Sequence, residues 1–158
     1  YHLDVTIARP FVYTGAGQPE RFYCASVARQ LSDWEAQRDG DEFRLPDLSC
    51  HRDMLHVQDV VTAYERLLED GRPNQTYNIC SGQTMSCREI VDELAREFGQ
   101  QITLYELPAS DEDAQLPHLC GDNRKLCEEL NWAPTHSAQD ALRELADSFR
   151  TAAAPAPQ

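Results

Sequence analysis

Short runs of β-branched and aromatic residues alternate with amphipathic helical patterns along the chain, and this alternation limits the possible folds more than any other feature. We expect strands at residues 5–12, 42–45, 54–57, 76–80 and 102–107. Helical patterns separate them at residues 22–35, 60–70 and 87–98, and a last one follows Ser137. Strands that alternate with helices of this length are typical of βαβ units, so the sequence predicts an α/β fold.

Helix ends are marked most clearly around residues 86–99. Ser86 and Glu89 have the spacing of a capping box, the apolar stripe of the helix ends at Phe98, and Gly99 follows as a stop signal. For the preceding helix we expect Asp59 as the N-cap and Gly71 as the stop. Both segments therefore predict packed helices.

The chain has 158 residues, 41% of them apolar, which is enough for one domain at residues 1–150. The Ala- and Pro-rich segment 151–158 is expected to be a disordered tail.

A net charge of -13 without a basic stripe argues against nucleic-acid binding. No apolar run is long enough to span a membrane and no signal-peptide pattern precedes the first strand, so we expect no membrane contact and a cytoplasmic location.

Six cysteines occur in the chain, without a C-x-x-C pair or a histidine at zinc-finger spacing. We expect buried free thiols and no metal site. The chain also begins at Tyr1, directly before a strand-like run, which indicates a piece of a longer polypeptide.

Single motifs in the chain say little. The Gly15-Ala16-Gly17 segment lacks the third glycine of a dinucleotide fingerprint and favours a turn. Arg52 and Asp53 could form an exposed ion pair, which would contribute little to stability.

The order and spacing of four longer blocks are more specific: A-R-P-F-V-Y-T-G-A-G-Q at 8–18, R-D-M-L-H-V-Q-D-V-V-T-A-Y at 52–64, T-Y-N-I-C-S-G at 76–82, and C-G-D-N-R-K-L at 120–126 followed by L-N-W-A-P at 130–134.

Together these blocks resemble the extended short-chain dehydrogenases, the NAD-dependent epimerase/dehydratase family that acts on nucleotide sugars. Within it the chain is most similar to GDP-4-keto-6-deoxymannose reductases and GDP-mannose 4,6-dehydratases. The resemblance implies the C-terminal part of a Rossmann-type enzyme, with the last parallel strands and a small α/β substrate-binding lobe. The parent enzyme would use NAD or NADP, and the sequence leaves that choice open.

The catalytic parts of such an enzyme are absent from the sequence. No tyrosine is followed four residues later by lysine, and the seven glycines never form the glycine-rich fingerprint. We therefore expect no catalytic residue in this chain and no NAD or NADP bound by the chain alone.

The resemblance assigns substrate recognition to a few residues. It implies that Arg52 contacts the substrate diphosphate, as a guanidinium fork suits phosphate oxygens. Pro10 and Phe11 would lie beside the nicotinamide, and the remaining implied substrate-pocket residues are Val12, Gln18 and Phe22. Val12 departs from the family, which has asparagine there, and residues 106–117 lack the arginine that the family offers to the nucleotide.

These observations favour the substrate-binding half of an NAD(P)-dependent nucleotide-sugar reductase, dehydratase or epimerase, which acts on a GDP-linked 4-keto-6-deoxy sugar and pairs with a missing N-terminal cofactor-binding half. Two alternatives stay open: a truncated, non-catalytic ligand-binding or interaction module, and a separately encoded half that pairs with a cofactor-binding chain. Dimers are common in the resembled family, so a homodimer is a further possible assembly.

Overall fold

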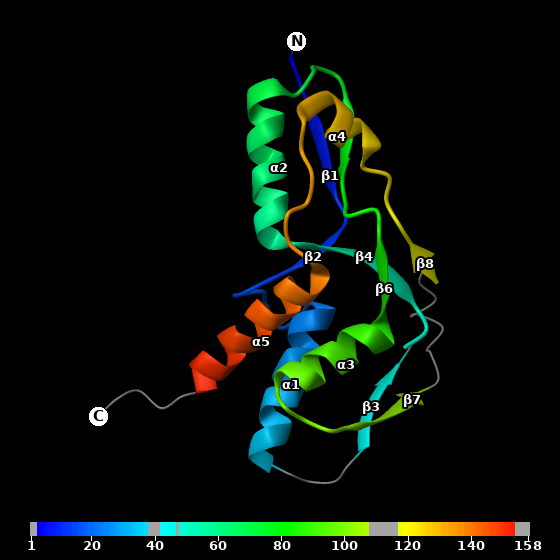
Figure 1. Cartoon of the computed structure of the whole chain (residues 1–158), viewed down its shortest axis with the longest axis vertical. Helices are drawn as coiled ribbons and strands as arrows, with labels where there is room; N and C mark the ends of the chain where they lie inside the picture. The colour runs from blue at the N-terminus through cyan, green and yellow to red at the C-terminus, as the bar shows by residue number, and fades with distance from the viewer. Residues whose placement is uncertain (1–2, 38–41, 47, 108–116, 154–158) are drawn as a thin grey trace, which may run out of the picture.

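The computed structural model describes residues 3–37, 42–46, 48–107 and 117–153 and has two hydrophobic cores at opposite ends of an elongated molecule. Figure 1 shows the end that contains the N-terminus at the top, and the three helices of the second core at the bottom. A small sheet of short strands, described below, lies between the two ends. The predicted α/β class is confirmed.

The upper end is a βαβ unit. Strand β1 (Ile7–Pro10) pairs in parallel with β5 (Thr76–Ile79), and helix α2 (Val57–Asp70) lies between them in the sequence. Helix α4 (Arg124–Leu130) packs on β5 and α2. Their buried side chains form one core: Leu55, Val60, Ala63, Leu67, Tyr77, Ile79, Leu126, Leu130 and Trp132.

The middle of the molecule is a small mixed sheet. Strand β4 (His51–His56) pairs in parallel with β2 (Val12–Thr14) and with β8 (His118–Leu119), and antiparallel with β6 (Thr84–Ser86). Three segments that are distant in the sequence therefore meet along β4.

The lower end packs three helices together: α1 (Tyr23–Gln37), α3 (Cys87–Glu97) and α5 (Ala138–Ala153). The parallel pair β3 (Glu42–Pro46) and β7 (Thr103–Leu107) lies beside them. The apolar stripes expected on the helices supply the core, which includes Val27, Ala28, Leu31, Ile90, Val91, Leu94, Leu142 and Leu145.

The helix-end predictions are confirmed for both ends of α3 and for the end of α2 at Gly71, and are wrong for the start of α2. Ser86 and Glu89 form the predicted capping box of α3, and Gly99 has the left-handed backbone that favours glycine, with φ of 69°. Helix α2 begins earlier than expected. His56 is its N-cap and accepts a hydrogen bond from Gln58 N–H, because the buried carboxylate of Asp59 is engaged elsewhere.

Several short elements were not predicted. The run at 5–12 splits into β1 and β2 at Phe11, and β6, β8 and α4 span only two to seven residues, too few for a clear periodic pattern. Helix α5 extends through Ala153, so the first residues of the expected tail are helical, and residues 154–158 lie outside the described chain.

The expectation that all six cysteines are free thiols is wrong. Cys50 and Cys87 form a disulfide with their Cα atoms 5.6 Å apart, within the usual span of such bonds. The other four are free: Cys24 and Cys80 are buried, Cys127 is half-buried and Cys120 is exposed. Across the described ranges, no group of three or more side chains is arranged to hold a metal, and no helix is long and apolar enough to cross a bilayer.

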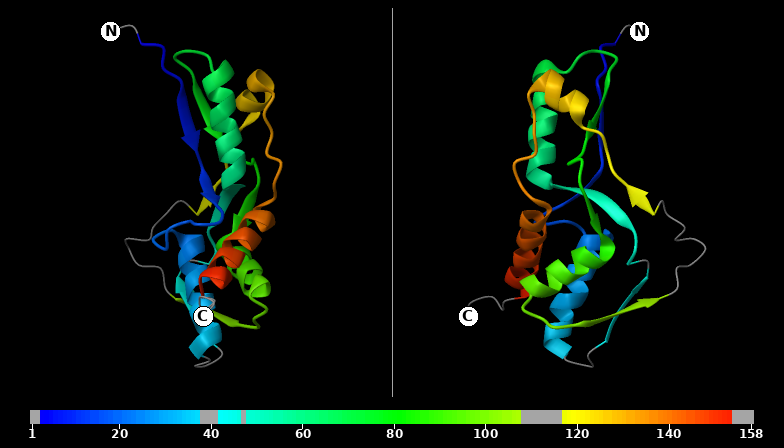
Figure 2. Two further views of the ribbon diagram at one scale, coloured as in Figure 1. Left: turned by 90° about the vertical axis from the view of Figure 1, so that its left-hand side faces the viewer. Right: turned by 45° about the vertical axis from the view of Figure 1, so that its right-hand side comes forward.

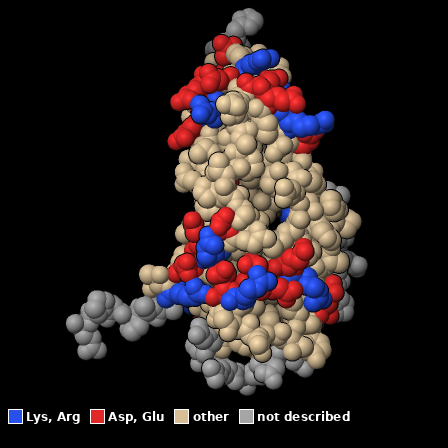
Figure 3. Space-filling view, in the orientation of Figure 1, with Lys and Arg blue, Asp and Glu red and all other residues tan. Residues whose placement is uncertain are grey.

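One side of the upper end leaves apolar groups exposed. Figure 2 shows β1 at the outer margin of this end, beside α2. Leu3, Val5 and Ile7 on and before β1 are 71%, 48% and 53% exposed. In Figure 3, charged side chains gather in two bands, one near each end, and the face between them is largely uncharged.

Candidate functional site

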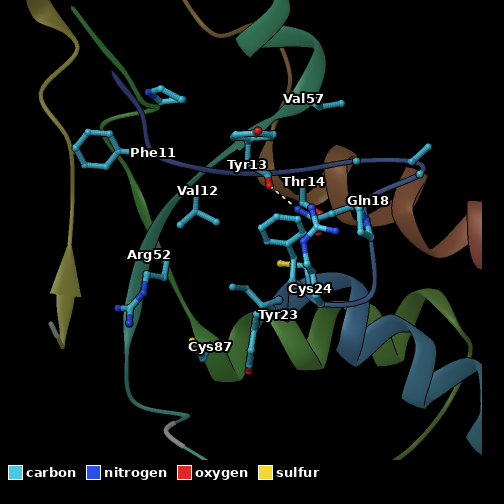
Figure 4. Close-up of a pocket in the computed structure, with 18 of the residues that line it drawn as sticks. Phe11, Val12, Tyr13, Thr14, Gln18, Tyr23, Cys24, Arg52, Val57 and Cys87 are labelled. Carbon is cyan, nitrogen blue, oxygen red and sulfur yellow. Dashed lines mark hydrogen bonds between the residues drawn. The ribbon is translucent and has the colours of Figure 1, made fainter. Parts of the chain in front are cut away.

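A cavity of about 870 Å³ lies where the middle sheet meets the lower helices. Figure 4 shows β2 and β4 on one side of it and the N-terminal ends of α1 and α3 on the other. Its lining comes mainly from residues 10–24, with additions from β4, α3 and β8: Pro10, Phe11, Val12, Tyr13, Thr14, Gly15, Ala16, Gly17, Gln18, Pro19, Arg21, Phe22, Tyr23, Cys24, Cys50, Arg52, Val57, Cys87, Ile90 and Leu119.

The turn after β2 forms one wall of the cavity. Gln18 fixes this turn from within, since its side-chain amide donates to the Tyr13 carbonyl at 2.8 Å and its side-chain oxygen accepts from the Thr14 hydroxyl at 2.8 Å. Gly17 has φ of 80°, a conformation that glycine adopts without strain. The turn therefore presents a fixed backbone to the cavity.

Arg52 reaches the cavity from β4. Side chains alternate along a strand, so Arg52 and the next residue, Asp53, point to opposite sides. The Arg52 guanidinium donates to the His51 carbonyl at 2.9 Å, and its strand neighbour Leu119 also lines the cavity. This places a half-buried cation on a mainly apolar wall.

Asp53 holds together the segments behind that wall. Its carboxylate is fully buried and accepts hydrogen bonds from the backbone N–H groups of Ser81 at 2.7 Å, Gly82 at 2.9 Å and Gly121 at 3.0 Å, and from the Ser81 hydroxyl at 2.7 Å. The position of β4 is thus fixed against two loops. The alternative in which Arg52 and Asp53 form an exposed ion pair does not hold, because the Asp53 carboxylate is fully buried on the opposite side of the strand.

Gly121 lies at the closest approach of two chain segments. A Cβ atom there would lie 2.4 Å from the Cys80 sulfur and 2.9 Å from the ring of Phe11. Only a glycine lets the backbone pass at this distance. Because Phe11 lines the cavity, the packing of Gly121 supports the cavity wall from behind.

A second buried carboxylate connects the start of α2 to the segment before α5. Asp59 accepts hydrogen bonds from the Thr135 hydroxyl at 2.8 Å and from the backbone N–H groups of Thr135 and His136, and its Oδ1 lies 3.0 Å from His136 Nδ1. The His136 ring stacks on His56 with ring centres 4.4 Å apart. His56 Nε2 lies 3.0 Å from a Glu144 oxygen, in a direction that forms no hydrogen bond.

The charges in this cluster stabilise one another. Burial pushes the pKa of Asp59 upward, but hydrogen bonds from His136 and Thr135 outweigh it, so the pKa lies below 3.8. The hydrogen bond with Asp59 raises the pKa of His136 above 6.5. The pair is therefore favoured as a carboxylate with an imidazolium.

All six residues that the sequence singled out line the same cavity: Pro10, Phe11, Val12, Gln18, Phe22 and Arg52. Phe22 is 45% exposed at its rim, with the Arg21 guanidinium 4.8 Å from the ring centre. The side-chain amide of Gln18 is engaged within its own turn, and Val12 offers no polar group.

Sequence reasoning missed several lining residues. Tyr13, Arg21 and Tyr23 are close in sequence to the first block and could have been added from that proximity. Cys50 and Cys87 could not, since they are 37 residues apart and no local pattern connects them.

The residues of the cavity do not fit a whole dinucleotide cofactor. The Val57 side chain fills the space beside the Gly15 α-carbon, and its Cγ1 would lie 2.6 Å from an added Cβ. A glycine is therefore required at this position by the packing of Val57, and the close approach does not come from a cofactor phosphate. Pro10 and Phe11 could contact a nicotinamide ring, but the sequence offers no glycine-rich cradle for the pyrophosphate.

Comparisons with known proteins identify the family of this chain. The sequence model of the family described as GDP-mannose 4,6 dehydratase matches residues 1–145. GDP-6-deoxy-D-mannose reductase of Pseudomonas aeruginosa is 32% identical over 147 residues, which cover 93% of this chain and 48% of that protein.

Solved structures show the same relationship. The structure of RMD from Pseudomonas aeruginosa complexed with NADPH matches with a TM-score of 0.86 and 30% identity, covering 94% of this chain and 49% of the other. UDP-glucose 4-epimerase from Thermotoga maritima, solved with UDP-glucose, matches with a TM-score of 0.82 over 95% of this chain and 47% of the other, and at 23% identity shows the fold alone.

The chain spans about half the length of the relatives it matches. The family match nevertheless covers the upper core, nearly all of the lower core and every residue that lines the cavity. The chain therefore belongs to the GDP-mannose 4,6-dehydratase family of extended short-chain dehydrogenases.

Proposed function

We propose that this chain is the substrate-binding half of an NAD(P)-dependent nucleotide-sugar oxidoreductase that acts on a GDP-linked 4-keto-6-deoxy sugar. The observation that carries the proposal is the cavity itself, which collects the residues of the first sequence block and Arg52 of the second on one lining. Its volume falls in the range of small-molecule sites, roughly 300 to 1,000 Å³.

The lining suits the parts of a nucleotide sugar. Phe11, Tyr13, Phe22 and Tyr23 supply aromatic surface for a planar base or the apolar face of a sugar. Arg52 supplies a cation for the diphosphate, with a planar fork that matches phosphate oxygens. In a chain with a net charge of -13, such a local cation has to overcome an unfavourable overall field.

The exposed apolar surface of the upper end supports the proposal that a cofactor-binding half packs against it. Parallel sheets occur almost only with both faces covered and with more strands than the pair β1 and β5. Helix α2 buries Val60, Ala63 and Leu67 on one face, yet Val61, Tyr64 and Leu68 on another face are 40%, 39% and 87% exposed. A helix with two apolar faces is typical of one buried between two layers.

We assign the cofactor and the catalytic groups to that partner half. The cofactor would supply hydride transfer there. This chain would bind and orient the sugar nucleotide and keep water from its reacting end.

A truncated, non-catalytic ligand-binding module is the second candidate. It is favoured by Val12, which replaces the polar contact of the resembled family, and by the absence from residues 106–117 of the arginine that the family offers to the nucleotide. The two candidates share the cavity and differ in whether a cofactor-binding half completes it.

Calorimetric titration of the chain with GDP-mannose and, separately, with NADPH tests the proposal. We expect GDP-mannose to bind and NADPH not to bind measurably. Arg52→Ala should weaken GDP-mannose binding about tenfold to a hundredfold, because a hydrogen bond to a charged group contributes about 1.5 to 3 kcal/mol.

Arg66→Ala is the matched control, since this arginine of α2 is exposed and pairs only weakly with Glu69 at 3.6 Å. It should leave the affinity unchanged. Equal affinity of the unmodified chain, Arg52→Ala and Arg66→Ala would show that Arg52 is not part of the binding site. An absence of GDP-mannose binding that persists after a cofactor-binding half from the Pseudomonas aeruginosa reductase is added would reject the substrate assignment.

A further inference from the structure

We propose that Cys50 and Cys87 form a redox-active cysteine pair in the wall of the cavity, whose disulfide is opened by small thiols and closed again by small disulfides that enter the cavity. The two residues are only 5% and 4% exposed, yet both line the cavity. The bond is thus shielded from most of the surface but open to a small molecule that occupies the site.

Backbone hydrogen bonds also hold together the two segments that the disulfide joins. The Cys87 backbone N–H donates to the Cys50 carbonyl at 2.8 Å, and Arg88 N–H donates to the Leu48 carbonyl at 3.1 Å. The adjoining residues pair in the β4 and β6 ladder, His51 with Ser86. Opening the disulfide therefore leaves these segments side by side, which is what a reversible pair requires.

The position of Cys87 favours it as the leaving thiolate. It is the first residue of α3, whose N-terminal end carries the positive end of the helix dipole (Figure 4). An incoming thiolate bonds to the Cys50 sulfur, the bond between the two cysteines breaks, and Cys87 leaves with the electron pair. The second thiol of a dithiol then displaces Cys50, so two electrons pass to the pair and the dithiol becomes a disulfide.

The third cysteine of the cavity does not compete in this exchange. Burial raises the pKa of Cys24 to about 12, so its thiolate is scarce near neutral pH. Its sulfur lies 3.7 Å from that of Met54, within the lower core. The exchange partner is therefore an external thiol.

The pair is coupled to ligand binding through its distance from Arg52. Cys50 directly precedes β4, Arg52 is the second residue of that strand, and both line the cavity, so their α-carbons are at most roughly 7 Å apart. A ligand held at Arg52 would cover the disulfide, and a thiol adduct on Cys50 would occupy part of the ligand's space. This coupling rests on the proposed function.

Alkylation and mass spectrometry of the full chain test the pair without any ligand. After unfolding without reductant, iodoacetamide should label Cys24, Cys80, Cys120 and Cys127, the four free cysteines, and leave a cross-linked peptide that contains Cys50 and Cys87. In the folded protein, dithiothreitol should open the bond while circular dichroism stays unchanged, and oxidised glutathione should close it again. Labelling of all six cysteines before reduction, or reduction that requires denaturant, would overturn the proposal.

A second measurement tests the coupling. GDP-mannose at ten times its Kd should slow reduction of the pair about tenfold, because only the unoccupied fraction reacts. Labelling of Cys127, half-buried on α4 in the other core, is the control and should not change. If reduction stays fast although calorimetry shows that GDP-mannose saturates the site, the coupling is rejected. If GDP-mannose does not bind, the result counts against the proposed function and leaves the alkylation result intact.

Discussion

The carboxylate of Asp53 accepts a hydrogen bond from the backbone N–H of Gly121 at 3.0 Å, across 68 residues of sequence. This contact joins the central strand β4 to the segment that leads into α4, and the same carboxylate holds the loop after β5. Arg52 lines the cavity from the opposite side of the same strand. Asp53 therefore fixes the strand that carries the proposed phosphate-binding arginine.

Asp53→Asn should lower the free energy of unfolding by about 2 to 4 kcal/mol, since an amide group cannot accept from all of the buried N–H donors and brings a donor of its own. Urea denaturation followed by circular dichroism measures the change. Asp33→Asn is the control, because Asp33 is half exposed and pairs with Arg29 at the surface, and it should change stability little. Equal stability of the two variants would contradict the role of Asp53.

Gly121→Ala should destabilise the protein more than Gly99→Ala. At Gly121 an added Cβ would lie 2.4 Å from the Cys80 sulfur, and overpacking of this kind costs roughly 3 kcal/mol. At Gly99 nothing lies within 4 Å, so only the left-handed backbone is penalised, by about 1 kcal/mol. Thermal unfolding of both variants gives the comparison, and the reverse order would show that the backbone near Gly121 relaxes.

The pair of Asp59 and His136 should make stability depend on pH at both ends of the range. The pKa of His136 is raised in the folded protein, so its contribution is complete below 6.5 and is lost as pH rises through the folded value. The pKa of Asp59 is lowered, so its contribution is complete above 3.8 and is lost as pH falls through the folded value.

His136→Gln should remove the alkaline loss and leave much of the acid loss, because the hydrogen bonds from Thr135 to Asp59 remain. Urea denaturation at a series of pH values measures both limbs, and an NMR titration of His136 measures its pKa directly. Glu144, Asp140 and the stacked His56 ring also face His136. An alkaline limb that persists in the variant would assign the titration to another group.

The double variant Val61→Glu/Leu68→Glu should reduce self-association of the isolated chain without loss of stability. Both side chains lie on the exposed apolar face of α2, where a charge removes the gain from burying apolar surface against another molecule. Leu107→Glu, a change at an exposed apolar residue of β7 in the lower end, is the control. Sedimentation equilibrium measures the association, and an equal effect of control and double variant would exclude α2 as the contact face.

The predictions from sequence succeeded where a local pattern was long enough. The 3.6-residue stripe of α3 and the capping box of Ser86 and Glu89 depend on neighbours within one or two helical turns, so the sequence contains all the information they need. The family blocks placed six residues that prove to line one cavity, although their roles in binding remain predictions.

The sequence by itself determined the α/β alternation, the main helices, the family and the absence of the Y-x-x-x-K and glycine-rich motifs. Only the tertiary structure decided that Asp59 bonds Thr135 and His136 instead of capping its helix, and that Cys50 meets Cys87. These contacts join segments tens of residues apart, and their energy comes from burial and from partners that no local window contains. Periodicity reports on near neighbours, whereas these contacts join residues that are distant in the sequence.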